Sequence, residues 1–245
     1  MGWFGENGTD EAMTREEYIA GLFSVYTLVA VLSEKNDSTV LRLRNKEKGR
    51  DLVLRSFPKY LVAYETLCGI RCENLPEVYD SVALEDGQIV LEQYIDGMTV
   101  AQVMETSRYR YRSAKKVLLG LCNALSVLHG QGLIHRDVKP ENVMVNKDGN
   151  AVLIDFNASR KFTPSTKDTV VMGTVGYAAP EQLGLLPTDA RTDIYAAGVL
   201  MNVMLTGKHP SESFAPGRAG KIVRKCTALN PNDRFQTAKK LAQVL

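Results

Sequence analysis

The sequence has few of the residues that mark several common classes of protein. It contains four cysteines, none in a CxxC pair, and only three histidines, so no zinc-ligand spacing occurs. Unpaired cysteines of this kind are typical of reduced proteins, and we expect a cytoplasmic location. The formal charge is only +2, so no strong field favours nucleic acid or an anionic membrane as a partner.

Long hydrophobic runs are also lacking. The most apolar stretch, residues 18–32, includes Ser24 and Thr27 and is short for a membrane span, which needs about 20 apolar residues. No basic region precedes it and no small-residue cleavage signal follows it, so it does not fit a signal peptide. We therefore expect no membrane segment in this chain. Residues 1–13 are rich in glycine and acidic residues, which predicts a flexible tail.

What remains is an ordinary globular composition, with 44% hydrophobic and 24% charged residues over 245 positions. The capping-box spacing of Thr14 and Glu17 predicts a short helix to about Phe23. Four segments rich in β-branched and apolar residues follow, separated by polar turns, and they predict a small antiparallel sheet; they are residues 26–32, 39–44, 51–57 and 88–94. Between the last two, Pro58 suits the first turn of another helix.

After about residue 97 the pattern becomes helical. In residues 113–130 an apolar stripe recurs at helical spacing, and residues 192–207 and 237–245 predict two more helices. A β-rich beginning and a helical remainder predict an α+β protein of two unequal lobes, residues 14–94 and 95–245, with a cleft between them.

Five short motifs carry the chemistry. In order they are HRDVKPEN (135–142), DFN (155–157), GTVGYAAPE (173–181), DIYAAG (193–198) and PNDRF (231–235). Together they resemble the signature set of eukaryotic-type Ser/Thr protein kinases, including the bacterial ones. The resemblance covers about residues 26–245 and is stronger after residue 90. It implies a bilobal fold with a small antiparallel β lobe and a larger helical lobe.

The resemblance also implies roles for the residues in these motifs. Asp137 would orient, or accept the proton of, the substrate hydroxyl, and Lys139 would lie beside the γ-phosphate of ATP. Asn142 and Asp155 would hold Mg²⁺ through oxygen ligands. A lysine two residues after the aspartate is the Ser/Thr-kinase pattern. ATP and Mg²⁺ are therefore the expected cofactors.

Other matched residues imply support and regulation. Asp193 would hydrogen-bond the backbone of the catalytic loop, and Glu181 and Arg234 would form a buried ion pair. Thr174 would contact the catalytic loop, and Arg136 would receive a phosphate carried by the activation segment. The candidate acceptors in that segment are Thr163, Ser165, Thr166 and Thr169.

The first lobe departs from the family pattern. Ser33, Lys35 and Ser38 stand where a glycine-rich loop has its three glycines, and only Val40 of that motif remains. Lys35 could supply a side-chain charge to the phosphates instead.

Arg55 stands where the family has the ATP-anchoring lysine, and its planar guanidinium group favours two-point pairing with a carboxylate. Glu65 is the partner expected from the following helix, and Asn157 replaces a glycine after the metal-binding aspartate. The gatekeeper and hinge, which would receive adenine, align with Leu91, Glu92 and Tyr94.

These features leave two main hypotheses. The first is a Ser/Thr kinase that transfers the γ-phosphate of Mg-ATP to a protein hydroxyl, including its own activation segment. The second is a pseudokinase that binds ATP or acts as a regulatory scaffold, because Arg55 and the missing glycines weaken the nucleotide site. A small-molecule kinase is a third reading, but such enzymes lack the VKPEN and GTVGYAAPE segments. The expected partner is a protein substrate or a regulatory protein.

Overall fold

The structure is a computed structural model that describes residues 13–162, 174, 176–184 and 187–245. By its internal contacts the chain divides into two units, Met1–Leu61 with Val78–Tyr94 and Val62–Glu77 with Ile95–Leu245. The sequence pattern placed residues 62–77 in the first lobe. They group with the second unit because this segment packs on that unit; the side-chain amide of Asn74, for example, donates to the Ala151 carbonyl at 2.7 Å.

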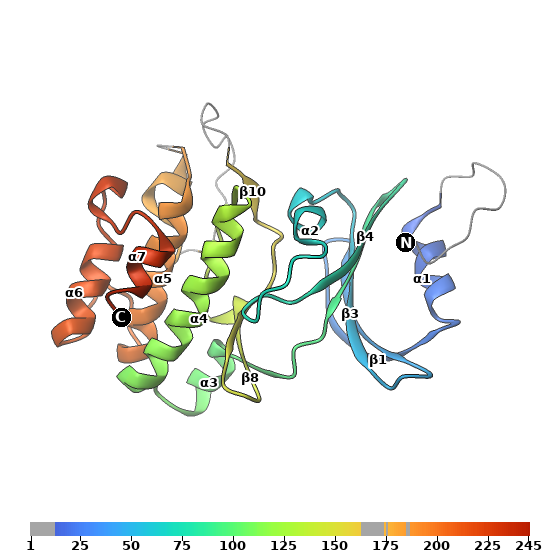
Figure 1. Ribbon diagram of the computed structural model, residues 1–245, viewed down its shortest axis with the longest axis horizontal. Coiled ribbons are helices and arrows are strands. Elements are labelled where there is room, and N and C mark those ends of the chain that lie inside the picture. The colour runs from blue at the N-terminus through green and yellow to red at the C-terminus, as the bar shows by residue number, and fades with distance from the viewer. Residues whose placement is uncertain (1–12, 163–173, 175, 185–186) are drawn as a thin grey trace. The chain divides into compact units, whose positions relative to one another are not determined.

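The first unit is an antiparallel sheet of five strands in the order β1-β2-β3-β5-β4 (Figure 1). Its elements are α1 (Arg15–Leu22), β1 (Tyr26–Lys35), β2 (Ser38–Asn45), β3 (Asp51–Phe57), β4 (Val78–Leu84) and β5 (Gly87–Gln93). Four of these strands coincide with the predicted segments. The strand β4 was missed because its centre, with Asp80 and Ser81, interrupts the apolar pattern that predicts a strand.

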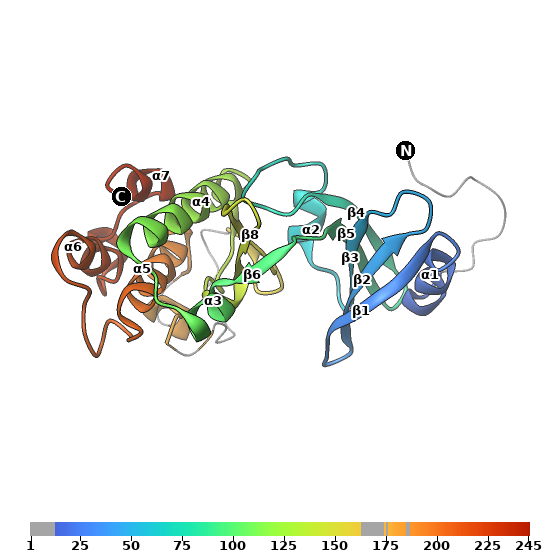
Figure 2. The same cartoon turned by 90° about the horizontal axis from the view of Figure 1, so that it is seen from below.

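Helix α1 covers one face of this sheet (Figure 2). It begins where predicted, because the backbone N–H of Thr14 donates to the Glu17 carboxylate at 2.8 Å and the Thr14 hydroxyl accepts from the Glu17 N–H. Side chains alternate along a strand, so one face supplies the core beneath α1. That core consists of Tyr18, Leu22, Leu41, Leu43, Leu52, Leu54, Ile89 and Leu91.

The hairpin between β1 and β2 closes without glycine. Its two turn residues, Asn36 and Asp37, have φ angles of 49° and 60°, the left-handed region that these two residue types tolerate. The Arg15 guanidinium of α1 donates to the Asp37 carbonyl at 3.0 Å and lies 3.1 Å from both the Asp37 and the Asp86 carboxylates. The turn predicted to stand in place of the glycine-rich loop is therefore held against α1 by Arg15.

Asp51 makes the stability of the first unit depend on pH in the acid range. Its carboxylate pairs with Arg44 at 2.6 Å and with Arg42, and the bond from Arg44 in particular holds the pKa of Asp51 at about 2. The pKa is below the ordinary value of 3.8, so the ionised carboxylate stabilises the fold fully above about pH 4. This contribution is lost as the pH falls towards 2.

Replacing Asp51 by asparagine is therefore expected to lower the free energy of unfolding at pH 7 by about 1 to 2 kcal/mol. It should also flatten the loss of stability between pH 4 and 2, because the titrating group is gone. Urea unfolding at a series of pH values measures both effects. Glu47→Gln, a similar change at an exposed position, is the control. If Asp51→Asn lost stability between pH 4 and 2 as steeply as the parent protein, Asp51 would not be the group responsible.

The second unit is mainly helical. It includes the helices α4 (Tyr111–Gly130), α5 (Ala190–Thr206), α6 (Gly217–Cys226) and α7 (Ala238–Ala242), with α4 packed against α5 and α7, and α5 against α6 (Figure 1). The apolar stripe of α4 is buried as the sequence predicted, at Val117, Leu121, Leu125 and Leu128.

The remaining elements of this unit include short strands and 3₁₀ turns. They are α2 (Val62–Leu67), β6 (Gly97–Thr99), α3 (Val100–Thr106), β7 (Leu133–Ile134), β8 (Val143–Asn146), β9 (Ala151–Leu153), β10 (Arg160–Lys161) and the 3₁₀ turns η1 (Pro140–Asn142), η2 (Pro180–Leu183) and η3 (Pro231–Asp233). Strands β8 and β9 form a hairpin between the first two motifs. The predicted start of the second helix at Pro58 is wrong: β3 continues to Phe57, and α2 begins only at Val62.

Two further observations concern the chain as a whole. All four cysteines are free. Within the described ranges, no helix combines the length and the apolar character that crossing a bilayer would require.

Candidate active site

The first motif forms a loop between β7 and η1, and a buried carboxylate holds its backbone. Asp193, in the first turn of α5, accepts from the N–H groups of His135 at 2.9 Å and Arg136 at 2.8 Å. The side-chain amide of Gln182 donates to the Arg136 carbonyl at 2.8 Å. Arg136 has a φ of 69°, an unfavourable conformation that persists only where surrounding bonds impose it. Asp193 and Gln182 thus hold the backbone of the loop in one conformation.

Asp137 lies at the centre of a compact network on this loop. Its Oδ1 accepts from the Thr174 hydroxyl at 2.8 Å, and its Oδ2 is 2.7 Å from the Lys139 ammonium. Lys139 also donates to the Thr174 hydroxyl oxygen at 2.8 Å, and the Asn142 amide donates to Asp137 Oδ2 at 2.9 Å. Four residues that the motif comparison singled out are therefore brought together in the folded chain.

This network determines the charge of Asp137. Burial by itself would raise the pKa of the carboxyl group, but hydrogen bonds from Lys139 and Thr174 and the positive charge of Lys139 outweigh it. The pKa of Asp137 consequently lies below its usual range, and the group is ionised at neutral pH. A carboxylate of low basicity is suited to orienting a hydroxyl group and accepting its proton late, rather than to removing it in advance.

The oxygen atoms that could bind a cation come from Asn142 and Asp155. Because the Asn142 amide nitrogen donates to Asp137, its carbonyl oxygen is left available as a ligand. Asp155 is partly exposed, and its Oδ1 accepts the Asn157 N–H at 3.2 Å. One carboxylate and one amide oxygen form a hard donor set, which fits a Mg²⁺ ion that keeps waters and phosphate oxygens as its other ligands.

No cluster of three or more metal-binding side chains of the types His, Cys, Asp and Glu occurs in the part of the chain that the structure describes.

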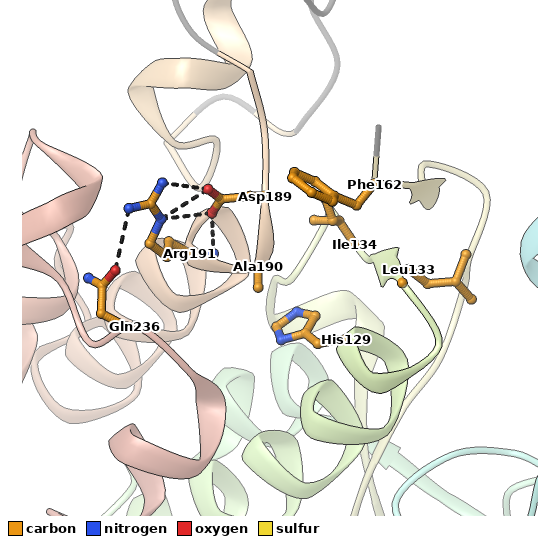
Figure 3. Close-up of a pocket in the computed structure, with 9 residues that line it drawn as sticks. His129, Leu133, Ile134, Phe162, Asp189, Ala190, Arg191 and Gln236 are labelled. Atoms are coloured by element: carbon orange, nitrogen blue, oxygen red, sulfur yellow. Dashed lines mark hydrogen bonds and ion pairs between the residues drawn. The ribbon is translucent and has the colours of Figure 1, made fainter. Parts of the chain in front are cut away.

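His129 of α4 also contacts Asp193, the carboxylate that holds the backbone of the loop. Its Nε2 lies 2.8 Å from Asp193 Oδ2. His129 also lines a cavity of about 300 Å³ whose other walls include Ile134, Phe162 and the ion pair between Asp189 and Arg191 (Figure 3). Burial by itself would raise the pKa of Asp193, but hydrogen bonds from His129 and from the backbone of the loop keep this pKa below its ordinary value.

Glu181 and Arg234 form the most deeply buried ion pair in the second unit as described. Two parallel bonds join them, at 2.6 and 2.8 Å, and the side chains are 2% and 0% exposed. The Thr192 hydroxyl donates to the same carboxylate at 2.9 Å, and Arg234 also donates to the carbonyls of Ala228 and Arg191. The pair links η2 to α5 and to the segment before α7.

The first unit pairs Arg55 differently from the expectation. Its Nε donates to Glu92 Oε1 at 2.7 Å, and both side chains are buried. Glu92 lies inside β5, on the face of the sheet that also carries Arg55. Glu65 is exposed on α2 in the other unit, so its pairing with Arg55 stays a prediction.

The assignment of Leu91, Glu92 and Tyr94 to the gatekeeper and hinge stays a prediction, and the structure places Leu91 and Glu92 on opposite faces of the sheet. Leu91 packs beneath α1, on the opposite face of the sheet from Arg55, because neighbouring side chains of a strand alternate. Glu92 is the residue of β5 that shares the face of Arg55. Tyr94 follows the strand, and the Arg42 guanidinium lies 4.1 Å above its ring.

The remaining predicted residues are placed without a tested role. Lys35 is exposed at the end of β1, and Val40 is opposite both Ser33 and Arg55 in the sheet. The predicted phosphate acceptors Thr163, Ser165, Thr166 and Thr169 lie outside the described residues.

Sequence reasoning missed two supporting residues, His129 and Gln182. The sequence around each of them does not distinguish it from an ordinary helix or loop residue. Gln182 directly follows Glu181 in the third motif, and that position was the only available signal.

An antiparallel β unit, a helical unit and an Asp–Lys–Thr network on a fixed loop define the class of kinase-like folds. Residues 35–242 match the family model described as the protein kinase domain. The chain therefore belongs to the protein kinase family. Helix α1 and most of β1 precede the matched residues.

Several of the proteins that this chain resembles are bacterial. A probable serine/threonine-protein kinase of Clostridium perfringens is 28% identical over 225 residues, which cover 81% of this chain and 32% of that protein. The probable serine/threonine-protein kinase PknB of Corynebacterium glutamicum is 32% identical over 186 residues, covering 63% and 29%. Serine/threonine-protein kinase D of Synechocystis is 28% identical over 225 residues, covering 82% and 44%. This chain thus spans about a third of the length of the first two relatives.

Proposed function

We propose that this protein is a serine/threonine protein kinase that transfers the γ-phosphate of ATP to a protein hydroxyl group. The observation that carries the proposal is the network in which Asp137 contacts Lys139, Thr174 and Asn142 at 2.7 to 2.9 Å. The names of the bacterial relatives support the same reaction.

Each residue has a defined part in this reaction. Asp137 accepts a hydrogen bond from the substrate hydroxyl and receives its proton as the hydroxyl oxygen bonds to the γ-phosphorus and the bond from that phosphorus to ADP breaks, so that ADP leaves. Lys139, fixed between Asp137 and Thr174, neutralises the charge that develops on the transferred phosphoryl group. Asn142 and Asp155 would hold Mg²⁺, which supplies further charge neutralisation at the phosphates when bound. A chain that fixes these groups in advance lowers the barrier because little reorganisation is needed during the reaction.

The pseudokinase alternative rests on one observation, the buried pair of Arg55 with Glu92. An arginine engaged in this way has less freedom to bind the α- and β-phosphates than a lysine in the same strand. We favour an active enzyme because the groups nearest the transferred phosphate are all present and in contact.

The first test is the intact mass of the purified protein, and of a general protein substrate such as casein, before and after incubation with Mg-ATP. Added phosphate on either, absent in Asp137→Asn, supports the kinase. Arg55→Lys separates the two hypotheses further: a loss of activity indicates an adapted site, and a large gain in ATP affinity indicates a degenerate one. No phosphate on any protein, together with no binding of ATP, would exclude the kinase proposal.

We also propose a cytoplasmic site of action and a protein as substrate or regulator. Four free cysteines and a reaction that consumes ATP fit a reducing, ATP-containing compartment.

A further inference from the structure

Tyr64 of α2 is fully buried beside the segment that carries the metal-binding Asp155. Its ring meets the ring of Phe156 edge to face, with centroids 5.6 Å apart. Its hydroxyl oxygen accepts the N–H of Phe156 at 3.3 Å, and the hydroxyl donates to Asn157 Oδ1 at 3.4 Å. One hydroxyl group therefore contacts both residues that follow Asp155.

Both bonds are long, but burial strengthens the bond between Tyr64 and Phe156. Tyr64 and Phe156 are both 0% exposed, so water does not compete for the bond between the Phe156 N–H and the hydroxyl oxygen. A tyrosine hydroxyl has one proton to donate and lone pairs to accept with, and both capacities are used here. Asn157 provides the acceptor that orients the hydroxyl proton.

The backbone at this point is unfavourable without support. Asp155 has a φ of 66°, in the left-handed region that costs a non-glycine residue energy. The N–H that Tyr64 binds belongs to the peptide between Asp155 and Phe156, so holding that peptide plane sets the direction of the Asp155 side chain. The exposed Asn157 also donates its N–H to Asp155 Oδ1 at 3.2 Å.

We propose that Tyr64 is a positioning residue for the metal site: its hydroxyl holds the Asp155–Phe156 peptide so that the Asp155 carboxylate faces the cation. Asn157, which stands where the family pattern has glycine, is the acceptor that completes this contact. The inference rests on the proposed function in so far as Asp155 binds Mg²⁺, and it adds a residue from α2 that no motif identifies.

Tyr64→Phe tests the inference because it removes only the hydroxyl group. We expect the Phe156 amide to exchange hydrogen about 3- to 10-fold faster, the change that the loss of one hydrogen bond produces. In titrations with ADP as the nucleotide, the affinity for Mn²⁺ should fall by a similar factor, while the affinity for ADP without metal stays the same. A purely structural role would not produce this dependence on metal.

Two further variants control the result. Tyr109→Phe removes another buried hydroxyl, one with no hydrogen-bond partner in the described part of the chain, and should change neither reading. Asn157→Ala changes an exposed side chain, so folding is not at risk, and it should accelerate Phe156 exchange to a smaller extent.

The outcomes separate this inference from the proposed function. If Asp155→Asn loses Mn²⁺ affinity while Tyr64→Phe keeps it, or binds Mn²⁺ more tightly, the inference is wrong and the proposed function stands. If Phe156 exchange is unchanged in Tyr64→Phe, the inference is also wrong. If Asp155→Asn binds Mn²⁺ as tightly as the parent, the assigned metal role and the positioning role both fail.

Discussion

Asp137→Asn is expected to reduce phosphate transfer by about 10²- to 10⁴-fold, the range over which a positioned acid–base group contributes to a rate. The amide keeps the shape of the carboxylate and can still accept the Thr174 hydroxyl, so the loop should stay folded. It cannot accept a proton, and it leaves Lys139 without the negative charge that lies 2.7 Å from its ammonium group. The loss should therefore appear in kcat much more than in KM.

The measurement is the initial rate of phosphate incorporation under saturating Mg-ATP, with thermal unfolding of each variant as a check on folding. Asp148→Asn, the same chemical change at an exposed turn between β8 and β9, is the matched control and should retain the parent rate. If Asp137→Asn retained more than about a tenth of the parent rate while folded normally, the assigned role of Asp137 would be wrong.

Glu181→Gln is expected to destabilise the second unit by about 3 to 5 kcal/mol, because it leaves the Arg234 guanidinium buried without its counter-charge. Arg234 is 0% exposed, so water cannot replace the lost carboxylate. In a protein of this size such a change lowers Tm by about 6 to 20 °C. Calorimetry or denaturant unfolding measures it, with no assay of activity required.

The exposed pair of Arg71 and Glu77, also in the second unit, provides the matched control. The side chains are 87% and 36% exposed and 3.2 Å apart, so Glu77→Gln should cost less than about 1 kcal/mol. The double variant Glu181→Leu with Arg234→Met should recover much of the lost stability, because it removes both charges together. Equal effects of Glu181→Gln and Glu77→Gln would show that the buried pair is not the support that its geometry indicates.

Local patterns predicted much of the secondary structure because local contacts decide it. The capping box at Thr14, the apolar stripe of α4 and four strands of the first sheet each depend on residues close in sequence. The start of α2 was predicted wrongly from Pro58, because the Leu61 N–H donates to the Gln88 side chain at 2.8 Å and the helix begins only at Val62. A hydrogen-bond partner 27 residues away is not visible in a local pattern.

The sequence by itself determined the family, four strands of the first sheet and the identity of the residues around Asp137, since these follow from motifs and periodicities that short segments carry. Only the tertiary structure decided the contacts between distant segments. It pairs Arg55 with Glu92, joins Gln182 to the Arg136 carbonyl and His129 to Asp193, and brings the Tyr64 hydroxyl to the Phe156 N–H. These contacts join residues 37 to 92 positions apart, and the packing of whole elements, rather than any local preference, determines which side chains meet.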